Sequence, residues 1–157
     1  MTTIVSNPHI TEAEWEVMRV IWSLDEATSR SVSEVLKDTQ NWEVATTKTL
    51  LGRLVKKGYL DTRKDGNRFI YLPLVTEEES VSNRVDKLFT SICNSAVGGA
   101  IAKAIDTHNL SKKDREIILA ALEAKEFVDS VPCSCLPNQT TKCNCETDNC
   151  KCGHNNN

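Results

Sequence analysis

Six of the seven cysteines in this 157-residue chain lie near its C-terminal end, between Cys133 and Cys152. They form three Cys-x-Cys pairs, and the second and third pairs together read Cys-x-Cys-x4-Cys-x-Cys. A disulfide within a Cys-x-Cys pair would close a small, strained ring, whereas four neighbouring thiolates can surround one ion. Thiolates select soft ions such as Zn(II) and Cu(I). The pattern therefore predicts a soft-metal site made by Cys143, Cys145, Cys150 and Cys152.

The remaining sulfur and nitrogen ligands are assigned less directly. Cys133 and Cys135 form the first pair and could extend the site with two additional thiolates. Structural zinc sites more often space their cysteines by two residues, so the Cys-x-Cys spacing favours copper–thiolate clusters with bridging sulfurs. A redox-active tail without metal is the alternative. His154 is expected to be idle, and Cys93 is expected to be a buried small hydrophobe on an apolar helix face.

The composition predicts a soluble cytoplasmic protein. Apolar residues make up 39% and charged residues 26% of the chain. The N-terminus lacks the basic region and apolar run of a signal peptide, and no stretch approaches the roughly 20 apolar residues that span a bilayer. In a reducing compartment, clustered thiols favour metal binding over disulfides.

A basic cluster lies in the middle of a chain whose net charge is −3. Residues 48–68 contain seven Lys or Arg against two Asp. Concentrated positive charge suits a phosphate backbone, because each neutralised phosphate releases counterions. A solvated helix face is the alternative interpretation of the charge alone.

The basic cluster begins on a predicted helix over residues 46–57. Its buried stripe is predicted to contain Leu50, Leu51, Leu54 and Val55, and Gly58 follows as a stop signal. The other positions are hydroxyls and cations, so the helix should bury one face and offer hydrogen-bond donors on the other.

Two helices are predicted before this one. Thr11 and Glu14 form a capping box that opens a helix over residues 10–22, with Trp15, Met18 and Trp22 on one apolar face. Residues 31–34 repeat the capping signal before a short second helix.

A hairpin is predicted after the basic helix. The apolar period changes to two, with β-prone runs over residues 59–64 and 68–72 joined across Asp65-Gly66. Basic residues flank the tip of this hairpin. Three short helices followed by a basic-tipped hairpin are typical of a winged helix-turn-helix.

Further helices follow Pro73. A third capping box at residues 76–79 opens a helix on which Val81, Val85 and Leu88 recur at the spacing of a helix–helix seam, continued by Ile92. A short apolar segment and a last helix from about 111 to 127 follow. These helices could pack on the first domain, but a homodimer interface is the preferred interpretation. The fold class is thus mainly α, with three regions: 1–75, a winged helix-turn-helix DNA-binding domain; 76–130, a helical dimerisation region; and 131–157, a Cys-rich metal-binding tail.

Several of these segments resemble the BlaI/MecI family of repressors, and the cysteine tail resembles its CopY-type copper-responsive members. The resemblance covers roughly residues 8–125 and rests on the first helix at 10–22, on 47–60 as recognition helix and strand entry, and on 71–75 as wing exit. The antibiotic-responsive relatives are switched off by proteolysis near an Asn-Phe bond. This sequence contains no Asn-Phe pair, which argues against a protease-switched repressor.

The resemblance implies a homodimer that binds a palindromic double-stranded operator ahead of copper-export genes. Zn(II) in the four thiolates would hold the DNA-binding state, and Cu(I), delivered by a copper chaperone, would replace it and release the operator. Two recognition helices would enter successive major grooves. The expected contacts are Thr46, Thr47, Lys48, Thr49 and Arg53 at base edges or nearby phosphates, with Lys56, Lys64 and Arg68 at the backbone.

Two other classes of function fit the sequence less well. A metallothionein-like copper and zinc buffer would use the six cysteines but gives no reason for a basic helix and wing. An enzyme is not expected, because the chain has only three histidines, no phosphate-binding loop and no Cys-x2-Cys redox motif.

Overall fold

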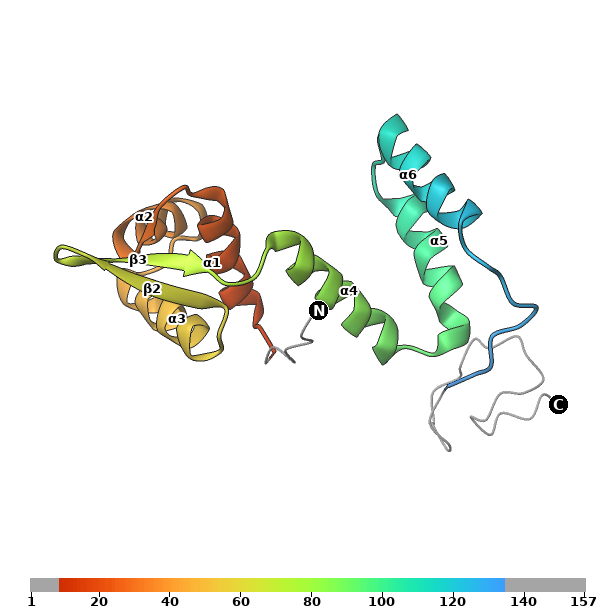
Figure 1. The fold of residues 1–157 in the computed structure, drawn as a ribbon, viewed down its shortest axis with the longest axis horizontal. Helices are drawn as coiled ribbons and strands as arrows, with labels where there is room; N and C mark the ends of the chain where they lie inside the picture. Colours follow the sequence, from red (N-terminus) through yellow and green to blue (C-terminus); the bar gives the residue numbers. More distant parts are fainter. Residues whose placement is uncertain (1–8, 135–157) are drawn as a thin grey trace. The chain divides into compact units, whose positions relative to one another are not determined.

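The computed structural model describes residues 9–134, which form two compact units that divide between Asn83 and Arg84. This division falls inside a helix, whereas the expected domain boundary lay before that helix. Cys135 and the four cysteines predicted to bind metal lie outside the described residues. The elements, in chain order, are α1 (Glu12–Ser23), β1 (Ala27–Thr28), α2 (Ser29–Gln40), α3 (Val44–Lys56), β2 (Leu60–Asp65), β3 (Arg68–Pro73), α4 (Glu77–Ser91), η1 (Asn94–Ala96), α5 (Val97–Thr107) and α6 (Lys112–Glu123) (Figure 1).

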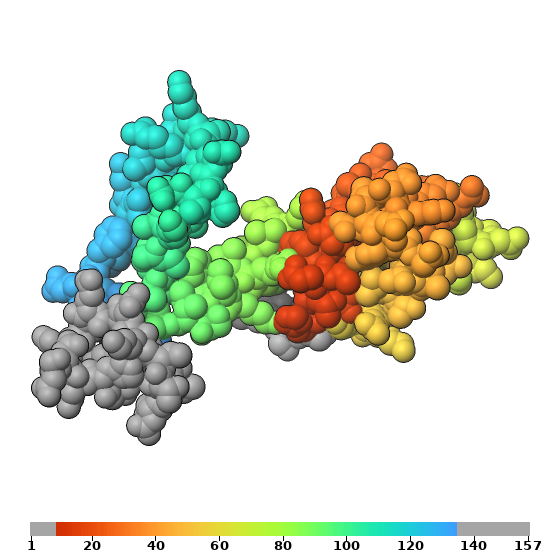
Figure 2. Space-filling model, turned by 180° about the vertical axis from the view of Figure 1, so that it is seen from behind, coloured from red at the N-terminus to blue at the C-terminus, as the bar shows by residue number. Residues whose placement is uncertain are grey.

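The first unit is a winged helix-turn-helix, as predicted. Its three helices are followed by the β2–β3 hairpin, and the two residues of β1 complete a sheet with strand order β1-β3-β2. All pairings in this sheet are antiparallel. In the space-filling view, the elements coloured red to yellow pack into one continuous body (Figure 2).

The helix starts follow local capping. The Thr11–Glu14 box closes the start of α1, and Thr76 and Glu79 exchange the same two hydrogen bonds at the start of α4, so both predictions are confirmed. The predicted start of α2 was wrong, because the helix begins about one turn earlier. Its N-cap is Thr28, which forms a reciprocal box with Ser31, so the predicted cap residue lies inside the helix.

The hairpin turn is shifted by one residue from its predicted position. Asp65 pairs with Arg68 in the register, so the two-residue loop is Gly66-Asn67 rather than Asp65-Gly66. Gly66 has a φ of 60°, which suits glycine at the first position of a type II′ turn. Pairing Asp65 across the end of the strands also places its carboxylate beside Arg68.

The core of the first unit lies where α1, α2 and α3 meet the sheet. The predicted stripe of α3 is confirmed, since Leu50, Leu51 and Leu54 are buried and Val55 packs at the margin. The tryptophans of α1 lie at the edge of the core rather than inside it: Trp15 and Trp22 are partly exposed and meet edge to face, with ring centroids 5.5 Å apart. The buried core residues here are Val17, Met18, Val20, Ile21, Ala27, Val32, Leu36, Leu50, Leu51, Leu54, Tyr59, Leu60 and Ile70.

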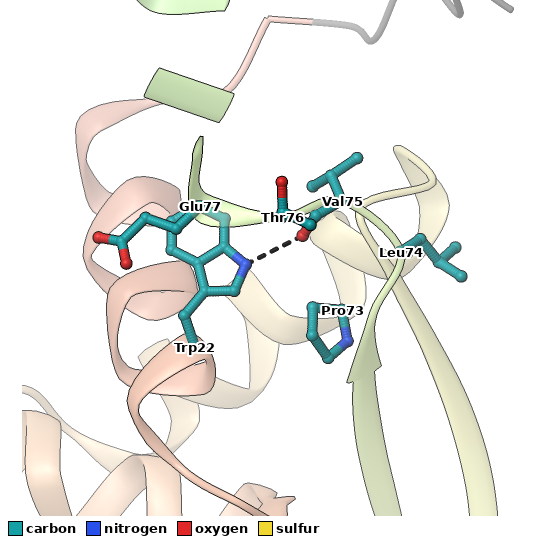
Figure 3. Close-up of a pocket in the computed structure, with 6 residues that line it drawn as sticks. All are labelled: Trp22, Pro73, Leu74, Val75, Thr76 and Glu77. Atoms are coloured by element: carbon teal, nitrogen blue, oxygen red, sulfur yellow. Dashed lines mark hydrogen bonds between the residues drawn. The ribbon is translucent and has the colours of Figure 1, made fainter. Parts of the chain in front are cut away.

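Trp22 of α1 binds the segment that follows the wing. Its indole Nε1 donates a hydrogen bond of 3.0 Å to the carbonyl of Val75, which immediately precedes the cap of α4 (Figure 3). Pro73, Leu74 and Glu77 complete a shallow hollow of about 340 Å³ around this contact. Its lining is mostly apolar and backbone, so it joins the wing exit to α1 and does not have the convergent polar groups of a catalytic pocket.

The helices after the wing expose their apolar side chains within a single chain. Val81, Val85 and Leu88 on α4 are all exposed, and Ser80 is the one buried residue of α4. No residue of α5 or α6 is buried. The last helix ends at Glu123, four residues before the predicted end.

Over residues 9–134, no single helix is long and apolar enough to cross a membrane. The segments Glu77–Ser91 and Asn94–Thr107 are long and apolar enough only in combination, and they are bent from one another by 117°. Such a bent pair is weak evidence for a span.

Candidate nucleic-acid interface

A three-residue connection sets α3 against α2. The second helix ends at Gln40, and Asn41 follows in the left-handed region with a φ of 55°. Asparagine tolerates this conformation better than most residues, and its N–H bonds to the carbonyls of Leu36 and Lys37. Two helices joined by so short a turn are the helix-turn-helix arrangement that presents its second helix to a DNA groove.

The third helix has one buried face and one exposed cationic face. Lys48, Thr49 and Arg53 are exposed on it, as are Thr46 and Lys56. Thr46, Thr49, Arg53 and Lys56 recur at spacings of three, four and three, and Lys48 lies next to Thr49, so these side chains lie on the side opposite the leucines that face the core. The hydroxyl of Thr49 donates to the carbonyl of Ala45 at 3.0 Å, which leaves its methyl group and oxygen lone pairs on the outer face.

Thr47 does not belong to this exposed face. It is 0% exposed, and its hydroxyl has no hydrogen-bond partner among the described residues. The prediction that Thr47 contacts DNA was therefore wrong. Thr47 carries a hydroxyl like Thr46 and Thr49, but the helical period places it with Leu50, Leu51 and Leu54 on the core side.

Replacing Thr47 by Val is expected to stabilise the first unit by about 1 kcal/mol and to leave DNA affinity unchanged. Valine keeps the β-branched shape and removes a buried hydroxyl that lacks a partner, which costs about 1–3 kcal/mol in general. Urea denaturation and a DNA titration of the same preparation would measure both quantities. Loss of affinity without loss of stability would return Thr47 to the interface.

Lys57 belongs to the basic cluster in sequence but not in space. Its Nζ lies 2.6 Å from the Glu14 Oε2 on α1 and 2.8 Å from the carbonyl oxygen of His9. The Glu14 side chain is 1% exposed and that of Lys57 is 25% exposed, so the carboxylate is buried and the ammonium reaches it from the margin of the unit. Burial opposes ionisation of Glu14, but hydrogen bonds from Lys57 and Thr11 and the Lys57 charge outweigh it and hold the pKa of Glu14 below its ordinary value.

The wing adds exposed cations, of which some are paired with carboxylates and others are not. Lys64 and Arg63 are exposed on β2. Arg68 is also exposed, but its guanidinium lies 2.8 Å from the Asp65 Oδ2 and 3.9 Å from a Glu26 carboxylate oxygen. Arg68 is therefore partly neutralised by its own unit. The cluster reduces from seven cations to five that are exposed without a described ion pair: Lys48, Arg53, Lys56, Arg63 and Lys64.

Several features of this surface were not predicted. Phe69 is 53% exposed and pairs with Lys64 across the hairpin, so both side chains lie on the same face of the wing. Val44 is exposed in the first turn of α3, where an apolar side chain could meet a thymine methyl group. Gly52 lies on the exposed face with open space around it, which shortens the distance at which the helix can approach another surface. The unusual glycine inside an otherwise strong helix is the sequence signal for that approach.

The N-terminus of α3 differs from those of α1, α2, α4 and α6. Each of these four has a reciprocal capping box, whereas Glu43 at the N-cap of α3 makes no side-chain cap hydrogen bond. Uncapped N–H groups and the positive end of the helix dipole favour an anion such as phosphate. This feature reinforces the positive character of the exposed face.

Comparison with known proteins also indicates that the chain is a DNA-binding repressor. The family model described as "Penicillinase repressor" matches residues 10–124. The chain belongs to the penicillinase repressor family. Members of this family are DNA-binding transcriptional repressors rather than enzymes, as was expected for this chain.

Three relatives illustrate the extent of the similarity. A 16.5 kDa protein of Latilactobacillus sakei, from the region 3′ of ptsI, is 43% identical over 88% of this chain and 94% of its own length. The methicillin resistance regulatory protein MecI of Staphylococcus aureus (strain N315) is 31% identical over 74% of this chain and 94% of its own. The solved structure of the CopR repressor is 48% identical, covers 43% of this chain and 99% of that chain, and has a TM-score of 0.38.

The thiols described in this family member lie in its second unit. Cys133, the predicted additional metal ligand, is buried at 7% exposure, and its Sγ lies 3.4 Å from that of Cys93. The prediction that Cys93 is a buried hydrophobe on a helix face was wrong. It lies just beyond α4 at the N-cap of η1, is only half-buried, and its sulfur contacts polar or sulfur atoms. Within residues 9–134, no group of three or more His, Cys, Asp or Glu is arranged around a single point.

Proposed function

We propose that this protein is a copper-responsive transcriptional repressor whose homodimer binds a palindromic operator. The observation that carries the DNA-binding part is the exposed face of α3, where Lys48, Arg53 and Lys56 stand beside short polar and small residues. Side chains of this kind fit the major groove, with cations on guanine or phosphate and hydroxyls on either. Membership of the penicillinase repressor family supports this use of the helix.

The homodimer is supported by the exposed apolar stripe of α4. Val81, Val85 and Leu88 recur at spacings of four and three and are exposed in the single chain. Burying such side chains against a second copy is favourable by about 25 cal/mol for each Å² of apolar surface removed from water. A symmetric dimer would present two copies of α3 to two half-sites about one helical turn apart.

Copper responsiveness is inferred from the tail sequence. The four thiolates of Cys143, Cys145, Cys150 and Cys152 are a donor set that suits Zn(II) and Cu(I), although these residues lie outside the described part of the chain. We infer that Zn(II) favours the DNA-binding state and that Cu(I) favours the released state. A metal can shift the balance only if it binds the two states unequally, so the operator should tighten zinc binding by the factor by which zinc tightens operator binding.

Selection from a random duplex library, followed by fluorescence anisotropy with the enriched sequence, tests this function. The full chain loaded with Zn(II) should enrich a palindrome, and stoichiometric Cu(I) should weaken binding by about 5- to 150-fold, the range of typical allosteric coupling. The matched control replaces Cys143, Cys145, Cys150 and Cys152 by Ser: it should still bind DNA in a salt-dependent manner but should not respond to Cu(I). If the full chain enriched no sequence and bound copper without any effect on DNA, metal buffering would be the better assignment.

A further inference from the structure

Two cysteines that lie 40 residues apart in the chain meet in the second unit. The Sγ atoms of Cys93 and Cys133 are 3.4 Å apart. Cys93 lies just beyond the end of α4, and α5 and α6 separate it from Cys133 in the chain. The two thiols are therefore brought together because the segment after α6 returns to the end of α4, not because they are neighbours in the sequence.

A second contact holds the same two segments together. The backbone N–H of Asn94 donates a hydrogen bond of 2.9 Å to the Ser134 Oγ, next in the chain to the cysteine contact. Cys133 is 7% exposed, whereas Cys93 is half-buried and has the Ser95 hydroxyl 3.1 Å from its Sγ. The pair therefore consists of one partly exposed cysteine in a polar environment and one buried partner, unlike a cysteine that merely fills an apolar core.

We propose that Cys93 and Cys133 are an oxidation site, at which a hydroperoxide converts the two thiols into an intramolecular disulfide. A disulfide bond is about 2.05 Å long, so the two sulfurs need to approach each other by only about 1.4 Å, a distance within reach of side-chain rotation. In a reducing compartment such a bond is transient, because thiol–disulfide exchange reopens it. This role is additional to the proposed DNA binding and does not depend on it.

The reaction balances with the hydroperoxide as the sole oxidant. Cys93, the more exposed cysteine, attacks the peroxide as its thiolate: an S–O bond forms, the O–O bond breaks, and the leaving oxygen takes up a proton as water or an alcohol. The Cys133 sulfur then attacks the sulfenic acid, so that the S–S bond forms, the S–O bond breaks and water leaves. The two sulfurs lose two electrons, which reduce the peroxide, and the two thiol protons end in the two product molecules.

The disulfide would fix the start of the cysteine-rich tail to the end of α4. It would close a loop that contains α5 and α6, and closing such a loop reduces the freedom of the unfolded segment. It would also occupy the sulfur of Cys133, the predicted additional metal ligand. Oxidation of this pair and metal binding by Cys133 would therefore exclude each other.

The test uses the full chain, free of metal, in which the five other cysteines are replaced by Ser: Cys135, Cys143, Cys145, Cys150 and Cys152. The reduced protein is treated with stoichiometric hydrogen peroxide, and its thiols are counted with a chromogenic thiol reagent. We expect both remaining thiols to be lost, the protein to migrate as a single chain on a denaturing gel without reductant, and dithiothreitol to restore both thiols. In the metal-free wild type, mass mapping should find the tryptic peptides 88–103 and 126–142 joined through Cys93 and Cys133.

Equilibration with glutathione distinguishes the folded contact from random closure of a flexible chain. The effective concentration of the two thiols in native buffer should exceed the value in concentrated urea by at least about tenfold, because folding holds the sulfurs together. Ser134→Ala, which removes the hydrogen bond from Asn94, should lower the native value, whereas the matched control Ser130→Ala, at an exposed position, should leave it unchanged.

Three results would overturn the proposal. One is an effective concentration that is equal in native buffer and in urea. The second is a disulfide that joins separate chains rather than the two cysteines of one chain. The third is peroxide treatment that leaves both thiols intact or oxidises each cysteine without forming an S–S bond. None of these measurements involves operator DNA, so failure of this proposal is distinguishable from failure of the proposed repressor function.

Discussion

Replacing Lys57 by Met is expected to lower the free energy of unfolding of the winged-helix unit at pH 7 by at most about 3–5 kcal/mol, the cost of removing one partner of a fully buried ion pair, because the Lys57 side chain is 25% exposed and partly screened by solvent. The Glu14 carboxylate would stay in a site where it is 1% exposed, without the ammonium that now lies 2.6 Å away. Its other oxygen, Oε1, has no hydrogen-bond partner in the described structure, so it offers no compensating contact.

The difference in free energy of unfolding between the wild type and Lys57→Met should become smaller as the pH falls. In the wild type, the pKa of Glu14 is held below its ordinary value of 4.5, so the pair contributes stability above that pH. This contribution is lost as the pH falls through the ordinary pKa and then through the lower pKa of the folded state. The variant lacks the ion pair, so acidification removes less of its stability. Urea denaturation followed by tryptophan fluorescence at pH 7 and near pH 4 would measure the change.

The control for this experiment is the double variant Glu14→Gln, Lys57→Met. Glutamine can fill the same position in the capping box with Thr11, but it carries no charge. Most of the lost stability should therefore return. Equal destabilisation of the single and double variants at both pH values would assign the loss to the packing of the Lys57 stem and contradict the charge explanation.

Replacing Arg53 by Ala is expected to weaken operator binding by about 1–3 kcal/mol per half-site, or about 5- to 150-fold, if Arg53 reads a base. The side chain is exposed on the outer face of α3, nearly three turns after the uncapped N-terminus of the helix. The proposed homodimer would present Arg53 twice, so the loss of affinity for a full palindrome should exceed the loss for a half-site. Anisotropy titrations on the selected operator, and on duplexes changed at one base pair at a time, would measure both affinity and specificity.

Two comparisons define the role of Arg53. Arg19→Ala removes the same charge from the exposed surface of α1, where Arg19 pairs with Glu16, and should leave operator affinity nearly unchanged. Lys56→Ala should weaken all sequences alike and reduce the salt dependence by about one phosphate contact. If Arg53→Ala behaves like Lys56→Ala, Arg53 contacts a phosphate; if it behaves like Arg19→Ala, α3 does not use this part of its face.

Local sequence signals predicted most of the first unit because they act within a few residues. The capping boxes at Thr11 and Thr76 each join residues three apart, and the leucine stripe of α3 follows from the helical period. The errors in this unit also arose locally, where two neighbouring residues could each have taken the same cap or turn position. Thr28, rather than Ser31, is the N-cap of α2. Because Asp65 pairs with Arg68, the hairpin loop lies one residue later than predicted.

The class of this protein, a winged helix with a basic third helix, could be inferred from the order of its residues alone, whereas the dimer seam and the metal-binding tail stay predictions. Which side chains are available to bind depends on the tertiary structure. Thr47 turns to the core, and Lys57 pairs with Glu14 from 43 residues away. Cys93 meets Cys133 across 40 residues. The physical reason is that capping and periodicity are set by neighbours in the chain, whereas the environment of a charge, hydroxyl or thiol depends on contacts that form only when distant segments pack.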